Sequence, residues 1–318
     1  MEKLGLSSRN IIGRFYQTLE EELAGSWSTN VGMMFDSNQE SETYKWLGQT
    51  PALREWIGGR QAKGLRSEGI TIKNRTFEAT LEIDVDDIRR DKTGQIMVRV
   101  DEMASRAAKH WESLMSARIV LGLTEKCYDG QYYFDVDHSE GDSGTQLNKL
   151  GATQVATLGV TSATAPTANE FADAIMGVIG YMYGWKDDQG EPINGSARAF
   201  LVYVPVVFWS AASIAVSANN LNTGTGVRDN PLLGAYKQGI SIAVIADPRL
   251  TWTTTWCLFR TDGRAKPFIM QEEVAPQVSA IAEGSEEEFK NNRHLYGVKA
   301  IRNVGFGLWQ HAAHCTFS

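Results

Sequence analysis

The stretch from residue 94 to residue 123 constrains the fold of this 318-residue chain more than any other part. Apolar side chains recur there at the i, i+3, i+4 and i+7 spacing of an amphipathic helix with one buried face. That face consists of Val100, Met103, Ala104, Ala107, Trp111, Leu114 and Met115. At about 1.5 Å per residue, this helix extends on the order of 40 Å, which is long for a globular domain. We therefore expect a spine along which other elements pack.

A run of alternating apolar and polar residues precedes this helix. Every second residue from Phe77 to Val85 is apolar, and this period predicts a half-buried antiparallel strand. We assign the strand to an extended hairpin over residues 46–93. Its first part is basic, with Arg54, Arg60, Lys63, Arg66, Lys73 and Arg75, whereas the part from Glu78 to Asp91 is acidic. Two interpretations stay open: the basic residues contact acids of an identical subunit, or they keep a solvated loop soluble.

Residues 1–45 are expected to form one helix and an extended arm. The helix spans Ile11 to Leu23, and the polar arm after it carries the apolar triplet Met33, Met34 and Phe35. Such a triplet needs a surface to cover it, which is the chain's own body in a monomer and a neighbour in an assembly.

The second half of the chain alternates predicted helices with predicted strands from residue 150 to residue 264. This pattern indicates a self-contained α/β or α+β subdomain. Thr167 and Glu170 form a T-x-x-E capping box at the start of one of these helices. Residues 265–318 contain an acid-rich stretch (283–289), expected to be an exposed connector, and end in a predicted strand pair.

The composition excludes several classes of protein. Hydrophobic residues make up 42% and charged residues 22%, as in soluble globular proteins, and the net charge of −7 argues against a surface that coats nucleic acid. Cys127, Cys257 and Cys315 form no C-x-x-C pair, so we predict no disulfide framework or zinc ribbon and expect a reducing compartment. We recognise no signal peptide and expect no membrane span, because the longest apolar runs, such as residues 200–209, are shorter than the ~20 residues that cross a bilayer.

Two clusters offer metal-ligand side chains. Asp135, Asp137 and His138 lie in the motif CYDGQYYFDVDH (127–138), but on a strand His138 points away from the two acids. We interpret this motif as a strand that runs into a turn. The second cluster, formed by His311, His314 and Cys315, lacks both an H-E-x-x-H pattern and a partner cysteine pair. With no G-x-S-x-G or phosphate-binding motif present, we predict no catalytic residue, no cofactor and no metal.

The order of these segments resembles the major head (capsid) proteins of phage Mu and its Mu-like prophage relatives, the T-protein family. The resemblance rests on four motifs: YKWLGQTPALREWIGGRQAKGL (44–65), NRTFEATLEIDVDDIRRDKTGQI (74–96), CYDGQYYFDVDH (127–138) and YGVKAIRNVGFGLWQ (296–310). It covers most of the chain from about residue 44 and is weakest over residues 140–260.

The resemblance implies an α+β chain with the Hong Kong 97 phage-type major capsid fold. Its parts are an N-terminal arm (1–45), an extended β-hairpin loop (46–93), a peripheral domain with the long spine helix (94–149), an axial domain (150–264) and a return to the peripheral domain (265–318). The implied function is the icosahedral shell of a tailed Mu-like bacteriophage, and the implied location is the virion, assembled in the bacterial host cytoplasm.

The resemblance also implies partners. These are further copies of the chain in hexamers and pentamers, a separate scaffolding protein, a portal, in some shells a decoration protein, and double-stranded DNA that is enclosed without sequence-specific binding. The hypothesised contact residues between subunits are Arg54, Arg60, Lys63, Arg66, Met33, Met34 and Phe35. Two alternatives stay open: an encapsulin-like compartment shell, which shares the fold, and a metal-dependent hydrolase that uses Asp135, Asp137, His138 and the C-terminal histidines.

Overall fold

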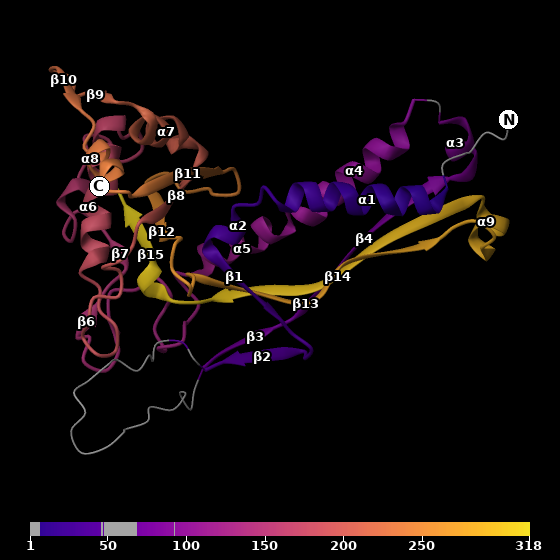
Figure 1. The fold of residues 1–318 in the computed structure, drawn as a ribbon, viewed down its shortest axis with the longest axis horizontal. Coiled ribbons are helices and arrows are strands. Elements are labelled where there is room, and N and C mark those ends of the chain that lie inside the picture. The colour runs from indigo at the N-terminus through magenta and orange to yellow at the C-terminus, as the bar shows by residue number, and fades with distance from the viewer. Residues whose placement is uncertain (1–6, 46, 48–68, 92) are drawn as a thin grey trace, which may run out of the picture.

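The structure, a computed structural model, describes residues 7–45, 47, 69–91 and 93–318. Figure 1 shows an elongated molecule in which a five-stranded sheet lies toward one end and a long four-stranded sheet extends to the other. The N-terminal helix starts at the far end of the long sheet, and the C-terminus lies in the five-stranded part. Helices and strands both contribute to each half, so the α+β class is confirmed.

The four-stranded sheet has the order β1-β13-β14-β4. Its strands are β1 (Gly32–Asp36), β13 (Phe268–Ile281), β14 (Arg293–Phe306) and β4 (Arg75–Asp84). β13 and β14 form a long antiparallel pair, and the short helix α9 (Glu286–Asn291) joins them at the tip. The acid-rich segment 283–289 is thus an exposed connector, as expected.

Strand β4 alternates as the sequence predicts, but its pairing is different from the prediction. Ile83 is buried and Phe77 and Leu81 are half-buried, whereas the acids between them are exposed. β4 pairs with β14 along its whole length, so its described partner lies outside the segment 46–93 that we assigned to the extended hairpin. A separate antiparallel pair consists of β2 (Ser41–Tyr44) and β3 (Ile70–Lys73), which come directly before and after residues 45–69 in the chain. The expected division into arm, hairpin, peripheral and axial parts stays a prediction.

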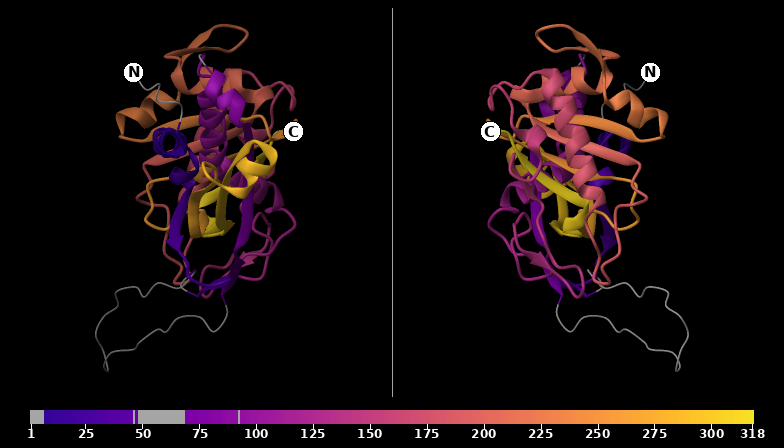
Figure 2. Two further views of the ribbon diagram at one scale, coloured as in Figure 1. Left: turned by 90° about the vertical axis from the view of Figure 1, so that its right-hand side faces the viewer. Right: turned by 90° about the vertical axis from the view of Figure 1, so that its left-hand side faces the viewer.

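Helices α1 (Ser8–Leu23) and α4 (Gln95–Ala108) lie side by side on one face of this sheet (Figures 1 and 2). Ile11, Phe15 and Leu19 of α1 are buried in the same cluster as Val100 of α4 and Tyr296 of β14. A bidentate ion pair reinforces this contact, since Arg14 donates to both Asp101 carboxylate oxygens at 2.7 and 2.8 Å. The helix predicted over residues 11–23 is confirmed.

The single helix predicted over residues 94–123 is interrupted. Lys109 separates α4 from α5 (His110–Leu121), although the predicted apolar stripe packs inward on both. At the interruption, Arg302 of β14 donates to the Ala107 carbonyl at 2.7 Å and to His110 Nδ1 at 3.1 Å. A side chain that binds helix carbonyls competes with the helix's own hydrogen bonds, which is a recognised cause of a helix break.

The five-stranded sheet has the order β11-β8-β12-β15-β7. Its strands are β11 (Ser241–Asp247), β8 (Ala199–Pro205), β12 (Thr255–Arg260), β15 (Ala312–Thr316) and β7 (Lys149–Leu150). Helices α6 (Ala168–Tyr183), α7 (Trp209–Ser217) and α8 (Leu232–Lys237) surround it. The predicted alternation is confirmed, but the subdomain is not self-contained, because β15 from the C-terminus pairs with β12 inside it. β14 and β15 therefore belong to different sheets rather than to one terminal pair.

The remaining elements are short. They are α2 (Ser28–Val31), α3 (Val85–Arg90), β5 (His138–Ser139), β6 (Thr145–Gln146), β9 (Asn220–Asn222), β10 (Val227–Asp229) and the 3₁₀ turns η1 (Ala156–Leu158), η2 (Val206–Phe208) and η3 (Trp309–His311).

Candidate functional site

The apolar triplet of the N-terminal segment lies on β1, an edge strand rather than an irregular arm. Met33 and Met34 pair with Ile269 and Met270 of β13. The Phe35 ring packs against the core, 5.1 Å from the ring of Tyr44, whereas Met34 is 45% exposed. The chain's own body thus covers Phe35, and the role of Met33, Met34 and Phe35 in contacts between subunits stays a prediction.

The basic residues of the predicted hairpin, Arg54, Arg60, Lys63 and Arg66, lie outside the described residues. Tyr44 and Ile70, the paired ends of β2 and β3, flank this segment, and Leu47, just after β2, is buried in the core. In Figure 1 this pair lies beneath β13 and β14, and it contacts both strands: the Tyr44 hydroxyl donates to Gln271 Oε1 at 2.9 Å, and Asn303 Nδ2 donates to the Lys73 carbonyl at 2.7 Å. The proposed role of the four basic residues stays a prediction.

The motif at residues 127–138 is a turn-rich loop, so the strand predicted there was wrong. Asp129 accepts a hydrogen bond from the Gln131 backbone N–H at 3.0 Å, and Gly130 between them has a φ of +89°. Farther along, Asp135 accepts from the Tyr132 N–H at 3.1 Å. Carboxylates that bind nearby backbone N–H groups favour turns over strand pairing, which accounts for the error.

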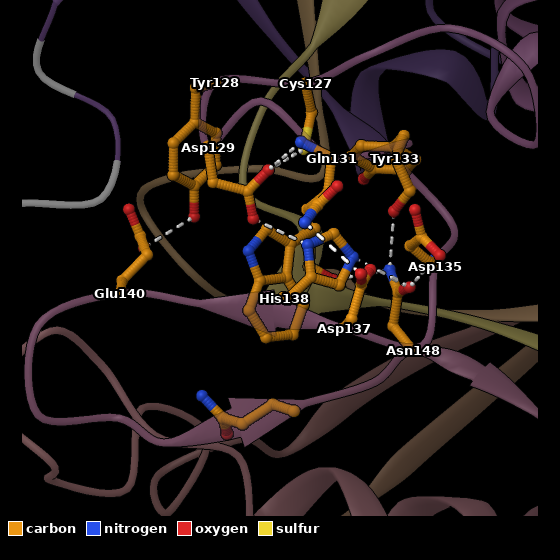
Figure 3. A network of polar contacts seen from close by, with 12 residues as sticks. Cys127, Tyr128, Asp129, Gln131, Tyr133, Asp135, Asp137, His138, Glu140 and Asn148 are labelled. Atoms are coloured by element: carbon orange, nitrogen blue, oxygen red, sulfur yellow. Dashed lines mark hydrogen bonds and ion pairs between the residues drawn. The ribbon is translucent and has the colours of Figure 1, made fainter.

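This loop brings Cys127, Asp129 and His138 together (Figure 3). Cys127 Sγ lies 3.0 Å from Asp129 Oδ1, and His138 Nδ1 lies 2.6 Å from Asp129 Oδ2. In the part of the chain that the structure describes, no other His, Cys, Asp and Glu side chains place three potential ligand atoms so close together, all within 4.8 Å. We call these three residues the loop cluster.

A second layer of contacts fixes the His138 ring. Its Nε2 lies 3.2 Å from Asn148 Oδ1, and its plane stacks on the Trp309 indole at 4.0 Å with an 8° tilt. Asn148 is itself held, because its Nδ2 donates to the Tyr133 carbonyl at 2.8 Å. The ring thereby joins the loop to the residues before β7 and to the turn η3 near the C-terminus.

The acids singled out from the sequence do not join this cluster. Both oxygens of Asp135 accept backbone hydrogen bonds, from Tyr132 and from Val136. Asp137 is exposed and accepts from Gln131 Nε2 at 3.4 Å. Of the predicted trio, His138 alone belongs to the loop cluster. Asp129 and Cys127 were missed, although the Asp-Gly pair at 129–130 is a turn signal that would have brought position 129 back toward the rest of the motif.

The C-terminal histidines, His311 and His314, are both buried, each in a different environment. Burial lowers the pKa of both His311 and His314 to about 4. His311 Nδ1 lies 3.0 Å from the Ala265 carbonyl, and the His314 ring packs between Phe134 and Trp252. Within the described residues, His311, His314 and Cys315 form no group of three converging ligands.

A patch of exposed apolar side chains lies where β8 leads into α7. Val206, Val207 and Trp209 are 52%, 63% and 58% exposed. We call this group the η2 patch. Large apolar side chains that cluster on a surface are typical of contacts with another protein. No helix in the described ranges has both the length and the apolarity to cross a bilayer.

Two curated relatives are similar to this chain. The chain is 34% identical over 144 residues to the Mu-like prophage FluMu major head subunit of Haemophilus influenzae, covering 45% of this chain and 47% of that protein. It is 38% identical over 117 residues to the major capsid protein of Escherichia phage Mu, covering 37% of this chain and 38% of that protein. The matched regions thus span less than half the length of either relative.

Solved capsid structures share the fold. The procapsid protein of bacteriophage JBD30 superposes with a TM-score of 0.54 and 24% identity, covering 98% of this chain and 77% of that one. The mature capsid protein of bacteriophage PhiM1 gives 0.55 and 11%, covering 92% and 87%. A virus-like particle from Pyrococcus furiosus gives 0.51 and 8%, covering 96% and 98%. The expected Hong Kong 97 type capsid fold is confirmed.

A family model extends the similarity over the four-stranded sheet and over every strand of the five-stranded sheet except β8. The model, described as Mu-like prophage major head subunit gpT, matches residues 8–164 and 227–316, more than half of the chain. These ranges include α1, the interrupted spine helix, the loop cluster and the long pair β13–β14. The chain therefore belongs to the Mu-like prophage major head subunit gpT family.

Proposed function

We propose that copies of this chain build the icosahedral head shell of a tailed Mu-like bacteriophage. Membership of the gpT family, matched over residues 8–164 and 227–316, is the observation that carries this proposal. The chain acts as a structural subunit: the function rests on its surfaces, and it catalyses no reaction. The shell encloses double-stranded DNA and is part of the virion.

The shape of the subunit supports this proposal. Each subunit of a closed shell must make several stable interfaces, each burying on the order of 1,000 Å² or more. An elongated body with a long strand pair on one side offers more surface to neighbours than a sphere of equal mass (Figures 1 and 2). Closed symmetry then limits growth to a finite particle of hexamers and pentamers.

The open edges of the four-stranded sheet also favour assembly. β1 and β4 are its two outer strands, and an unpaired edge is a template for a strand or extended segment of another chain. Beside β4, a groove of about 570 Å³ runs between this strand and α4, with Phe77, Leu81 and Met103 among its apolar lining. A neighbouring subunit that covers this groove would bury both the edge and the apolar surface.

The charge of the chain is compatible with a DNA container. A net charge of −7 does not favour tight DNA binding, and a shell needs none, since it confines the genome by closure. We propose a separate scaffolding protein and a portal as assembly partners in the bacterial cytoplasm, with a decoration protein as a further addition to the finished shell.

We propose that the basic residues of the predicted hairpin, Arg54, Arg60, Lys63 and Arg66, bind acidic residues of an adjacent subunit. Reversing two of these charges, with Arg60→Glu and Lys63→Glu together, should abolish fast-sedimenting particles while leaving the secondary structure of the subunit intact. The matched control, Arg60→Lys, keeps the charge and should assemble. Unaltered assembly of the double variant would remove these residues from the interface.

The contents of purified particles test the proposed function against the compartment alternative. We expect phage particles to hold DNA that nuclease cannot digest until the shell is opened. Particles that carry a defined protein cargo and no protected DNA would instead indicate an encapsulin-like compartment.

A further inference from the structure

The loop cluster has the composition and geometry of a metal site. We propose that Cys127, Asp129 and His138 bind one divalent transition metal ion of the zinc type, which ties the 127–138 loop to the body of the subunit. This inference is independent of the shell function, because it concerns the folded subunit alone.

The three donor types are those that zinc selects. A thiolate, a carboxylate and an imidazole nitrogen are its ordinary protein ligands, with bonds of about 2.0–2.3 Å in tetrahedral geometry. Ligand atoms around such an ion lie roughly 3–4 Å apart, and here all three lie within 4.8 Å of one another. The 2.6 and 3.0 Å hydrogen bonds that now join them need to open by less than about 1 Å to admit the ion.

The surroundings of His138 match those of a metal-binding histidine. Such a histidine binds the metal through one ring nitrogen and donates its other N–H to an oxygen acceptor that fixes the ring. Asn148 Oδ1 supplies this acceptor at Nε2, while Nδ1 faces the cluster (Figure 3). Asn148 cannot turn its amide around without losing the bond from Nδ2 to the Tyr133 carbonyl. This outer contact lies beyond the three ligands and is independent of their mutual hydrogen bonds.

Metal binding at these three residues displaces protons, which leave to solvent. In the metal-free loop, Cys127 Sγ donates to one Asp129 carboxylate oxygen and His138 Nδ1 lies 2.6 Å from the other. On binding, the thiol proton and any proton carried by Nδ1 leave to solvent, and bonds form from the ion to Sγ, a carboxylate oxygen and Nδ1. Metal binding that releases ligand protons in this way is general for thiol and imidazole ligands.

A substitution at Cys127 can distinguish a metal site from a cluster that is held by hydrogen bonds alone. In the metal-free loop its Sγ donates to Asp129 Oδ1 at 3.0 Å, and a bound metal would take the place of this proton. A serine hydroxyl can still donate to Asp129 but is a poor ligand for zinc-type ions. The variant Cys127→Ser therefore preserves the hydrogen-bonded cluster and removes the metal site.

The test is a titration of the purified, unassembled subunit with Co²⁺, a spectroscopic substitute for Zn²⁺. We expect one Co²⁺ per chain, a thiolate-to-cobalt absorption band, and displacement of the cobalt by Zn²⁺. Cys127→Ser should lose the band, with a fall in affinity larger than the roughly 10–100-fold that removal of an outer-layer partner costs. Asp137→Asn is the matched control, because this exposed acid lies in the same loop outside the cluster, and it should bind like the wild type.

Two results would overturn the proposal. The first is a folded wild-type subunit, checked by circular dichroism, that takes up neither Co²⁺ nor Zn²⁺; the three residues would then be a hydrogen-bonded cluster only. The second is an unchanged thiolate band in Cys127→Ser, which would place the metal at another cysteine. The wild-type titration decides the first point even if a variant fails to fold.

Discussion

Arg302 is the most deeply buried arginine or lysine among the described residues, and its contacts show what it does in the structure. It is 1% exposed, its guanidinium stacks over the Trp111 ring at 4.6 Å, and it lies 3.6 Å from Glu272. It also donates to the Ala107 carbonyl at the interruption of the spine helix. One side chain thus connects β14, β13 and the junction between α4 and α5.

Replacing this arginine should destabilise the subunit strongly. Arg302→Met keeps the aliphatic length but leaves the Glu272 carboxylate and the Ala107 carbonyl without their partner. Because the loss of one member of a buried pair costs about 3–5 kcal/mol, we expect the free energy of unfolding, measured by urea denaturation, to fall by about 3 kcal/mol. The control Arg293→Met breaks a half-exposed pair with Glu82 and should cost less than about 1 kcal/mol. Equal costs for the two variants would contradict this account.

His314 should make stability depend on pH. Burial, with a smaller effect of Lys149, lowers its pKa to about 4 from an ordinary value of 6.5. Between pH 6.5 and 4 the unfolded chain therefore binds a proton that the folded chain does not, so stability is lost as the pH falls. One such group contributes a slope of about 1.4 kcal/mol per pH unit.

The variant His314→Leu should lose this slope. Neither ring nitrogen has a hydrogen-bond partner among the described residues, so leucine removes the proton site without breaking a bond. Denaturation at pH 7 and pH 5 should show a smaller drop in stability for the variant than for the wild type. Identical drops would mean that His314 does not titrate in this window.

The residue types in the sequence indicated which side chains could bind a metal. They did not indicate which of these side chains lie close together in the fold. His138 was singled out from the sequence, yet Asp129, nine positions earlier, is its hydrogen-bond partner, and Asp135 and Asp137 are not. The contact depends on a turn at Gly130 and on anchoring by Asn148 and Trp309. Asn148 lies ten positions after His138 and Trp309 lies near the C-terminus, and neither leaves a periodic signal in the sequence.

At the scale of elements, local patterns predicted local structure well. The helix of α1, the stripe on α4 and α5, the alternation of β4 and the capped start of α6 all follow from spacing along the chain. The Thr167 side chain accepts from the Glu170 N–H, and the Glu170 carboxylate accepts from the Thr167 N–H, as the capping box requires.

This capping box gives a direct test of local stability. Thr167→Ala removes the side-chain acceptor at the N-terminus of α6 and should lower the free energy of unfolding by about 1 kcal/mol. The control Thr164→Ala changes an exposed residue in the loop just before the helix and should stay within about 0.5 kcal/mol of the wild type. A Thr167 variant as stable as the wild type would show that tertiary packing alone holds this end.

Pairing between elements could not be predicted in the same way. β4 pairs with β14, more than 200 positions later, and β15 enters the five-stranded sheet beside β12. The interruption at Lys109 likewise depends on Arg302, which is remote in sequence. The period and composition of a segment indicate which face of the helix or strand is buried. They do not indicate which other element covers that face.

At the scale of the whole molecule, the chain crosses repeatedly between its two sheets. After the five-stranded part, it runs out along β13, turns at α9, returns along β14 and ends in β15 (Figure 1). The last strand, β15, pairs with β12 and β7 in the five-stranded sheet. The end of the chain therefore links the long sheet to the five-stranded sheet.

The η2 patch should matter for assembly and not for folding. Trp209→Asp places a charge on the exposed apolar surface and should reduce the yield of particles at least about tenfold, since desolvating an unpaired charge opposes burial. Its circular dichroism spectrum and melting temperature should match the wild type. The control Trp209→Tyr retains an aromatic ring and should assemble, whereas normal assembly of Trp209→Asp would exclude the patch from the interfaces.

The central proposal is that copies of this chain, together with a separate scaffolding protein, form a closed shell. The most direct measurement is negative-stain electron microscopy of particles purified from cells that express the two proteins together. We predict closed icosahedral shells, accompanied by rings of five or six subunits where assembly is incomplete. A persistent monomer or small dimer under the same conditions, with the subunit folded, would contradict the account.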